Sequence, residues 1–154
     1  MIAPGLESDP AMIEWRGLAF DAPFWKPDAA FTPFPDDGVA DLWAISQDQP
    51  ALLVPSLWPL LSPVEQRRAG RYVDPVHRRY YVVRQAALRA VLARYTGELP
   101  SRIPFQTGSH GKPYLADERI HFNLSDAGPL VVVAVGNVPL GVDVDMARPG
   151  LSLN

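Results

Sequence analysis

The feature that most constrains the fold of this chain is a long helix predicted for residues 75–95. Asp74-Pro75 is a typical helix start, because proline suits the first helical position, and Gly97 provides a stop. Between these points apolar residues recur at spacings of three and four, which predicts a stripe that packs on another layer of the fold. The stripe consists of Val76, Tyr80, Val83, Ala87, Val91 and Tyr95.

Other segments predict strands around this helix and a short helix before it. Residues 39–45 are expected to form a first strand with Trp43 buried. Ser62-Pro63-Val64-Glu65 is a capping box that starts a short helix through about Tyr72. We therefore expect an α+β fold, with a helix packed on a mainly antiparallel sheet. The later strands are predicted at residues 103–105, 121–124, 130–135 and 140–145, and a hairpin turn at Gly136-Asn137 is expected to join the last two.

Residues 1–38 differ in composition from the rest of the chain. Prolines, which interrupt helices and central strands, alternate there with Trp and Phe residues. We expect an extended arm that packs on the domain formed by residues 39–149 or on a neighbouring chain, and a tail over residues 150–154. With no cysteine, no leader and no apolar run of 18 residues, a cytoplasmic protein without a membrane span is expected.

Charge is distributed unevenly along a chain whose net charge is −3. Acidic residues dominate residues 1–61, whereas arginines dominate residues 62–94. A basic segment in an acidic protein indicates a localised anionic partner, and the lack of a nucleic-acid-binding motif argues against nucleic acid. We expect most of the arginines to form a solvated face, with Arg78 and Arg89 in line on the outer surface. The arginines are Arg67, Arg68, Arg71, Arg78, Arg79, Arg84, Arg89 and Arg94.

Two aspartates near the end of the chain are candidates for metal ligands. In an extended segment, Asp143 and Asp145 point to one face while Val142 and Val144 point to the other. Two carboxylates at this spacing can converge on a hard cation such as Mg²⁺. A solubilising edge strand is the alternative interpretation. Two candidate anion-binding elements precede the pair, Gly111-Lys112-Pro113 and Phe122-Asn123-Leu124-Ser125.

The order of these elements resembles the Sfp-like 4′-phosphopantetheinyl transferases over about residues 42–149. That family has an arginine-rich helix, then Gly-Lys-Pro, Phe-Asn-(Leu/Ile)-Ser-His-Ser and Gly-(Val/Ile)-Asp-(Val/Ile)-Glu. The resemblance implies one half of a pseudo-dimer fold. It also implies a Mg²⁺-dependent transfer of 4′-phosphopantetheine from coenzyme A to a serine of an acyl or peptidyl carrier protein.

The resemblance also implies roles for individual residues. Asp143 and Asp145 would hold the metal, and Gly111, Lys112, Pro113 and Ser125 would bind coenzyme A. The phosphate-binding arginine of the family aligns with Arg79 or, after a shift of one residue, with Arg78 or Tyr80, and its role is assigned to Arg78 and Arg79 jointly. Arg67 and Arg68 lie where members of the family often have basic residues facing the adenosine phosphate. Asp126, at the coenzyme A site, replaces the family's histidine and reverses the local charge, and Ala127 replaces the next serine.

This chain ends at Asn154, whereas the family carries a similar second half with a Trp-x-x-Lys-Glu motif. No catalytic residue is therefore assigned here, and the general base is expected from that missing half. Self-association or a separate second-half subunit would complete the site. The alternative is a truncated or decayed module that binds coenzyme A or has a structural role without catalysis.

Overall fold

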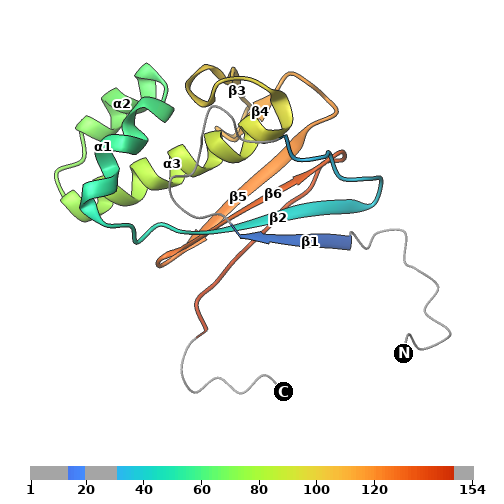
Figure 1. Cartoon of the computed structure of the whole chain (residues 1–154), viewed down its shortest axis with the longest axis horizontal. Coiled ribbons are helices and arrows are strands. Elements are labelled where there is room, and N and C mark those ends of the chain that lie inside the picture. The colour runs from blue at the N-terminus through green and yellow to red at the C-terminus, as the bar shows by residue number, and fades with distance from the viewer. Residues whose placement is uncertain (1–13, 20–30, 148–154) are drawn as a thin grey trace.

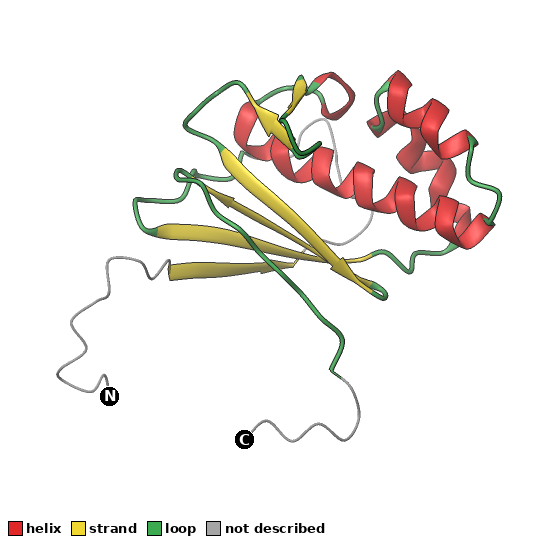
Figure 2. Ribbon diagram, turned by 180° about the vertical axis from the view of Figure 1, so that it is seen from behind, coloured by secondary structure: helices red, strands yellow, loops and turns green. Residues whose placement is uncertain are grey.

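The computed structural model describes residues 14–19 and 31–147, which form two layers (Figure 1). One layer is a four-stranded sheet, and helices cover one of its faces (Figure 2). A two-stranded sheet lies near one end of the longest helix (Figure 1). The predicted α+β architecture is therefore confirmed. None of the helices in the described ranges is long and apolar enough to cross a membrane.

The larger sheet has the strand order β1-β2-β6-β5. β1 (Glu14–Ala19) pairs in parallel with β2 (Val39–Ser46). β6 (Leu130–Gly136) lies between β2 and β5 (His121–Ala127) and is antiparallel to both. A tight turn at Gly128 joins β5 to β6. β5 is thus an edge strand and β6 a central one.

The long helix α3 (Pro75–Thr96) follows two shorter ones, α1 (Val54–Leu57) and α2 (Pro63–Gly70). Asp74 accepts hydrogen bonds from two amides of the first turn of α3, which lower the pKa of its carboxyl. Gly97 ends α3 with φ of 74°, a left-handed conformation that favours glycine. The remaining elements are the 3-10 helices η1 (Ala51–Leu53), η2 (Trp58–Leu60) and η3 (Pro100–Arg102), and the strands β3 (Phe105–Thr107) and β4 (Pro113–Leu115).

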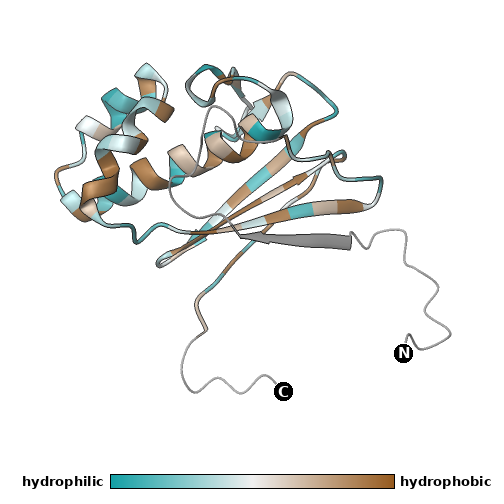
Figure 3. Ribbon diagram, viewed as in Figure 1, coloured by the Kyte–Doolittle hydropathy of each residue, from teal (hydrophilic) through white to brown (hydrophobic). Residues whose placement is uncertain are grey.

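The centre of α3 is buried on nearly every side. Val83, Ala87 and Val91 are buried as predicted, but Val76 is 44% exposed in the first turn. A single apolar stripe was expected, whereas α3 contacts β6 on one side and α1 and α2 on another. Figure 3 shows the hydrophobic centre of α3 and the alternation of hydrophobic and hydrophilic residues along the strands.

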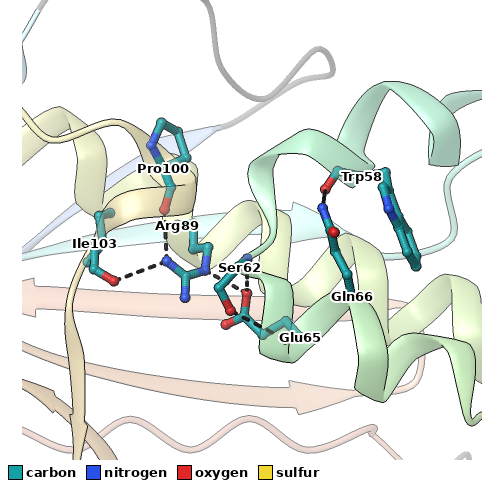
Figure 4. A network of polar contacts seen from close by, with 7 residues as sticks. All are labelled: Trp58, Ser62, Glu65, Gln66, Arg89, Pro100 and Ile103. Atoms are coloured by element: carbon teal, nitrogen blue, oxygen red, sulfur yellow. Dashed lines mark hydrogen bonds and ion pairs between the residues drawn. The ribbon is translucent and has the colours of Figure 1, made fainter.

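The prediction that Arg89 lies on the outer surface in line with Arg78 is wrong. Arg89 is only 3% exposed. Its Nε donates to Glu65 Oε2 at 2.6 Å, and its Nη1 donates to the carbonyl oxygens of Pro100 at 2.8 Å and Ile103 at 3.1 Å (Figure 4). The charge tolerates burial because an acid and two carbonyls satisfy it.

The same carboxylate completes the predicted capping box of α2. Glu65 Oε2 accepts from the Ser62 amide at 2.9 Å, and Ser62 Oγ accepts from the Glu65 amide (Figure 4). The guanidinium of Arg89 also lies 4.7 Å from the centre of the Phe105 ring. One ion pair therefore connects α2, α3, η3 and the start of β3.

The predicted strand over residues 140–145 is wrong, as is its hairpin with β6. This segment is extended but joins no sheet. The reason is that β2 and β5 already occupy both edges of β6. The strand predicted at 103–105 is displaced by two residues, to β3.

Part of the predicted N-terminal arm packs on the domain. Residues 14–19 form β1 on β2, and the Phe34 ring meets the Tyr95 ring edge to face at 5.8 Å. Residues 1–13, 20–30 and 148–154 lie outside the described residues. The boundaries between arm, domain and tail remain predictions.

Replacing Arg89 with leucine should lower the free energy of unfolding by about 3 to 5 kcal/mol, because a mostly buried carboxylate loses its cation. Urea denaturation of Arg89→Leu measures the loss. Glu65→Gln keeps an acceptor for the Ser62 amide and isolates the charge of the pair. Arg102→Leu, at an exposed arginine of η3, is the control and should stay within about 0.5 kcal/mol of the wild type. Equal effects at Arg89 and Arg102 would contradict the assigned role of the ion pair.

Candidate functional site

The Phe-Asn-Leu-Ser sequence predicted to bind phosphate lies on β5. Phe122 is buried and Leu124 packs against the core, so both side chains face the helix layer. Successive strand residues point to opposite faces of a sheet, which directs Asn123 and Ser125 away from the helices. β5 therefore presents polar groups on the face that the helices leave open.

The extended segment after β6 is attached to these polar side chains. Asn123 Oδ1 accepts from the Val142 amide at 2.9 Å, and Ser125 Oγ accepts from the Val144 amide at 3.1 Å. The two acceptors on β5 are two residues apart, and so are the two amides that donate to them. The segment therefore runs alongside β5. Val142 and Val144 are half-buried, whereas Asp143 between them is exposed. The alternation predicted for this segment is therefore present. The hydrogen bonds that hold the segment on β5 are accepted by side chains of β5, not by its backbone.

This attachment brings two of the predicted site residues together. Ser125 Oγ donates to Asp143 Oδ1 at 3.3 Å, so the serine contacts one candidate metal ligand directly. Asp145 is exposed and its Oδ1 accepts from the Met146 amide at 2.8 Å. Within the described part of the chain, the Oδ2 atoms of Asp143 and Asp145 make no hydrogen bond. Both carboxylates can therefore offer an oxygen to a ligand.

The donor set fits part of a magnesium site. Mg²⁺ prefers oxygen ligands, and proteins often bind it through one or two carboxylates plus waters and substrate phosphates. Asp143 and Asp145 supply such a pair. No cluster of three or more His, Asp or Glu side chains that could hold a metal occurs in residues 14–19 and 31–147. The remaining ligands would come from water, phosphate oxygens or another polypeptide segment.

The Gly111-Lys112-Pro113 element forms the turn between β3 and β4. The Gly108 amide donates to the Lys112 carbonyl at 2.9 Å, and the Gly111 amide donates to the Gly108 carbonyl at 3.0 Å. Gly111 has φ of 76°, where a side chain would cause strain. Pro113 begins β4. The turn holds the exposed Lys112 in a defined place on the surface.

A hollow of about 530 Å³ connects this turn with β5. Lys112 and Pro113 line it, together with His121 at the start of β5 and Leu140 from the segment after β6. His121 was not among the residues predicted for the site. The period-two pattern contains the signal, since it places His121 on the same face as Ser125.

The predicted phosphate-binding arginines lie at the start of α3. Arg78 Nη2 donates to the Tyr72 carbonyl at 2.7 Å, and Arg79 Nη2 lies 3.4 Å from Asp48 Oδ1. Tyr72 precedes α3 and Asp48 follows β2, so both arginines are held at that end of α3. Neither contact brings an arginine to Lys112 or Asp143. A role of Arg78 and Arg79 in phosphate binding stays a prediction.

A second hollow, of about 600 Å³, lies at α2. Its lining includes Arg67, Arg68 and Arg71, and all three side chains are exposed. Tyr72 also lines it and packs against Tyr81, with ring centres 5.2 Å apart and ring planes tilted by 34°. Burial raises the pKa of Tyr81, which is 3% exposed. This cationic surface contains the two residues expected to face an adenosine phosphate.

Asp126 points to the helix side of β5. Its Oδ2 lies 3.5 Å from Nη1 of Arg84 on α3, so the charge reversal noted in the sequence is balanced by a cation. Arg84 was not assigned to the site from the sequence. The assigned residues Lys112, Ser125, Asp126 and Asp143 thus all lie on or beside β5.

Several known proteins are similar to this chain in sequence. The family described as "4′-phosphopantetheinyl transferase, N-terminal" matches residues 43–137. The 4′-phosphopantetheinyl transferase HetI of Nostoc sp. is 36% identical over 113 residues, or 70% of this chain and 48% of HetI. A putative 4′-phosphopantetheinyl transferase of Synechocystis sp., slr0495, is 31% identical over 112 residues, or 70% and 45%. Sfp of Bacillus subtilis is 28% identical over 90 residues, or 58% and 40%.

The chain spans about half the length of the curated relatives it matches. The family match includes the helix α3, the Gly-Lys-Pro turn and β5, on which the candidate site is built. This chain belongs to the 4′-phosphopantetheinyl transferase family.

Proposed function

We propose that this chain takes part in moving 4′-phosphopantetheine from coenzyme A to a serine of an acyl or peptidyl carrier protein. The observation that carries the proposal is the contact between Ser125 and Asp143. It joins a predicted phosphate ligand to a predicted metal ligand at one point on β5. A cytoplasmic location, expected from the cysteine-free sequence, is part of the proposal.

Lys112 and its turn account for recognition of the nucleotide part of coenzyme A. The lysine offers a positive charge to a phosphate, and Pro113 offers an apolar surface within the same hollow. Gly111 keeps the turn narrow. Ser125 can exchange its hydrogen bond to Asp143 for one to a phosphate oxygen, because a hydroxyl both donates and accepts.

Asp143 and Asp145 would hold Mg²⁺ with their carboxylate oxygens. When bound there, the metal would neutralise negative charge on the pyrophosphate. Asn123 and Ser125 contribute indirectly, since they hold the backbone of Val142 and Val144 on either side of Asp143. The carboxylates are thereby positioned before any ligand arrives.

In the proposed reaction the serine oxygen of the carrier protein attacks the β-phosphorus of coenzyme A. A new bond forms between that oxygen and phosphorus, the bond from phosphorus to the departing phosphate oxygen breaks, and 3′,5′-ADP leaves. The serine proton passes to a general base. None of the described residues is assigned this role, and we place the base in a second subunit or second half.

Exposed apolar residues support assembly beside the metal ligands. Val138 is 43% exposed and Met146 is 56% exposed, and they lie before and after Asp143 in the same segment. A second copy of the chain or a separate second half could cover them. The alternative function is a non-catalytic module that binds coenzyme A or has a structural role. That alternative holds if no partner supplies a general base, because none of the described residues is assigned this role.

Coenzyme A should bind to this chain in a Mg²⁺-dependent manner. Lys112→Ala should weaken the binding by about 1.5 to 3 kcal/mol, because a charge-assisted phosphate contact is lost. Isothermal titration calorimetry in millimolar Mg²⁺ measures the dissociation constants. Arg102→Ala, at an exposed arginine outside both hollows, is the control and should bind as the wild type does. Absence of any binding by the wild type would leave only a structural role.

The chain should form a symmetric dimer with its interface beside residues 141–145. Met146→Lys should weaken this dimer, because a charge would enter an apolar contact. Sedimentation at micromolar concentration reports the mass, and mass spectrometry of an added carrier protein reports transfer. Val73→Lys is the control, since Val73 is 95% exposed and lies before α3. A well-folded monomer would contradict the dimer, and transfer by that monomer would contradict the need for a partner.

A further inference from the structure

Arg84 projects from the middle of α3 toward the edge strand β5. Its side chain is 25% exposed, and Nη1 lies 3.5 Å from Asp126 Oδ2. That distance is long for a charge-assisted hydrogen bond, so the pair is loose. A guanidinium has five N–H donors, and Asp126 uses one of them. Arg84 thus retains donors for another acceptor on the helix side of β5, beside Asp126.

An aromatic ring holds Arg84 close to a second arginine. The guanidinium carbon of Arg84 lies 5.9 Å from the centre of the Tyr81 ring, and that of Arg68 lies 5.5 Å from the same centre. Tyr81 itself packs against the Tyr72 ring. Two like charges around one ring repel each other, and Asp126 is the carboxylate that contacts one of them. The positive charges of Arg68 and Arg84 around Tyr81 therefore favour the binding of another anion.

The hollow at α2 extends this positive surface. Arg67, Arg68 and Arg71 line it, and among the residues that the structure describes no acidic side chain does. Arg68 belongs both to the hollow and to the Tyr81 group, so the cations continue from α2 across Tyr81 to Arg84 and end at β5. A ligand with more than one phosphate fits such a surface, because guanidinium groups bind phosphate oxygens in pairs.

We propose that Arg84, held over Tyr81 beside Arg68 and against Asp126, is a further phosphate-binding residue for coenzyme A. This inference rests on the function proposed above. In it, Asp126 restrains the guanidinium in the free chain and competes with the incoming phosphate. Asp126 puts a negative charge on β5 next to the phosphate, and Arg84 on α3 supplies the positive charge that compensates for it.

Two substitutions at the pair separate this role from a structural one. If the ion pair serves only the fold, Arg84→Gln and Asp126→Asn break the same contact and neither changes affinity for coenzyme A. If Arg84 binds phosphate, Arg84→Gln weakens binding whereas Asp126→Asn does not. Arg84→Gln should weaken binding about tenfold, the loss of one charge-assisted contact. Asp126→Asn should bind as tightly as the wild type or several-fold more tightly, because a repelling carboxylate is gone.

Calorimetry at low salt with Mg²⁺ measures these shifts, and three further samples make the result specific. Arg84→Lys keeps the charge and should recover part of the affinity. Arg119→Gln breaks another Arg–Asp pair, with Asp117 at 2.9 Å, and should leave affinity unchanged. Lys112→Ala tests the site independently of Arg84.

The outcomes distinguish the two proposals. If Lys112→Ala weakens binding and Arg84→Gln does not, the function stands and the role of Arg84 is wrong. If the wild type binds no coenzyme A, both are wrong. Should Arg84→Gln fail to fold, the Nε–H resonance of Arg84 in the wild type still reports contact. It should shift on addition of inorganic pyrophosphate, and an unchanged resonance would overturn the inference.

Discussion

The buried ion pair between Arg89 and Glu65 is the interaction on which the arrangement of the other elements depends. A charge removed from water is costly unless it is fully paired, and Arg89 is paired by one carboxylate and two backbone carbonyls. Because Glu65 also caps α2, the orientation of α2 on α3 is coupled to the path of the chain through Pro100 and Ile103. That path leads into β3, and so Arg89 helps to position the turn that carries Lys112, although the two residues lie apart.

β5 organises the candidate site because its two faces have different chemistry. Apolar side chains anchor the strand to the core, while Asn123 and Ser125 on the opposite face bind the segment that carries Asp143. Asn123 and Ser125 hold this segment by its backbone amides, so the side chains of Asp143 and Asp145 stay exposed. Carboxylates that bind a metal together with phosphate need such exposure. As an edge strand, β5 also offers its helix side, where Asp126 meets Arg84. Both side chains of this pair are partly exposed, so a ligand group can reach them.

Features that depend on local signals could be predicted from the sequence. The capping box at Ser62, the Asp74-Pro75 start of α3 and the strand at residues 121–124 all follow from residues close together in the sequence. The burial of Arg89 could not be predicted, because Glu65 lies 24 residues away and two of its partners are backbone carbonyls. The pattern of residues 140–145 is that of a strand, but it does not reveal that both edges of β6 are occupied. The partner of Asp126 was equally hidden, since Arg84 lies 42 residues earlier on another element.

The central claim is that β5 joins the Lys112 turn and the Asp143 segment into one coenzyme A site within this chain. Nuclear magnetic resonance of the ¹⁵N-labelled chain during titration with coenzyme A tests this most directly. With Mg²⁺ present, the amides of Lys112, Ser125 and Val144 should shift together with a single dissociation constant, and Mg²⁺ alone should shift only residues 143–145. Shifts confined to the Lys112 turn, or separate dissociation constants for the two groups of amides, would contradict a single site.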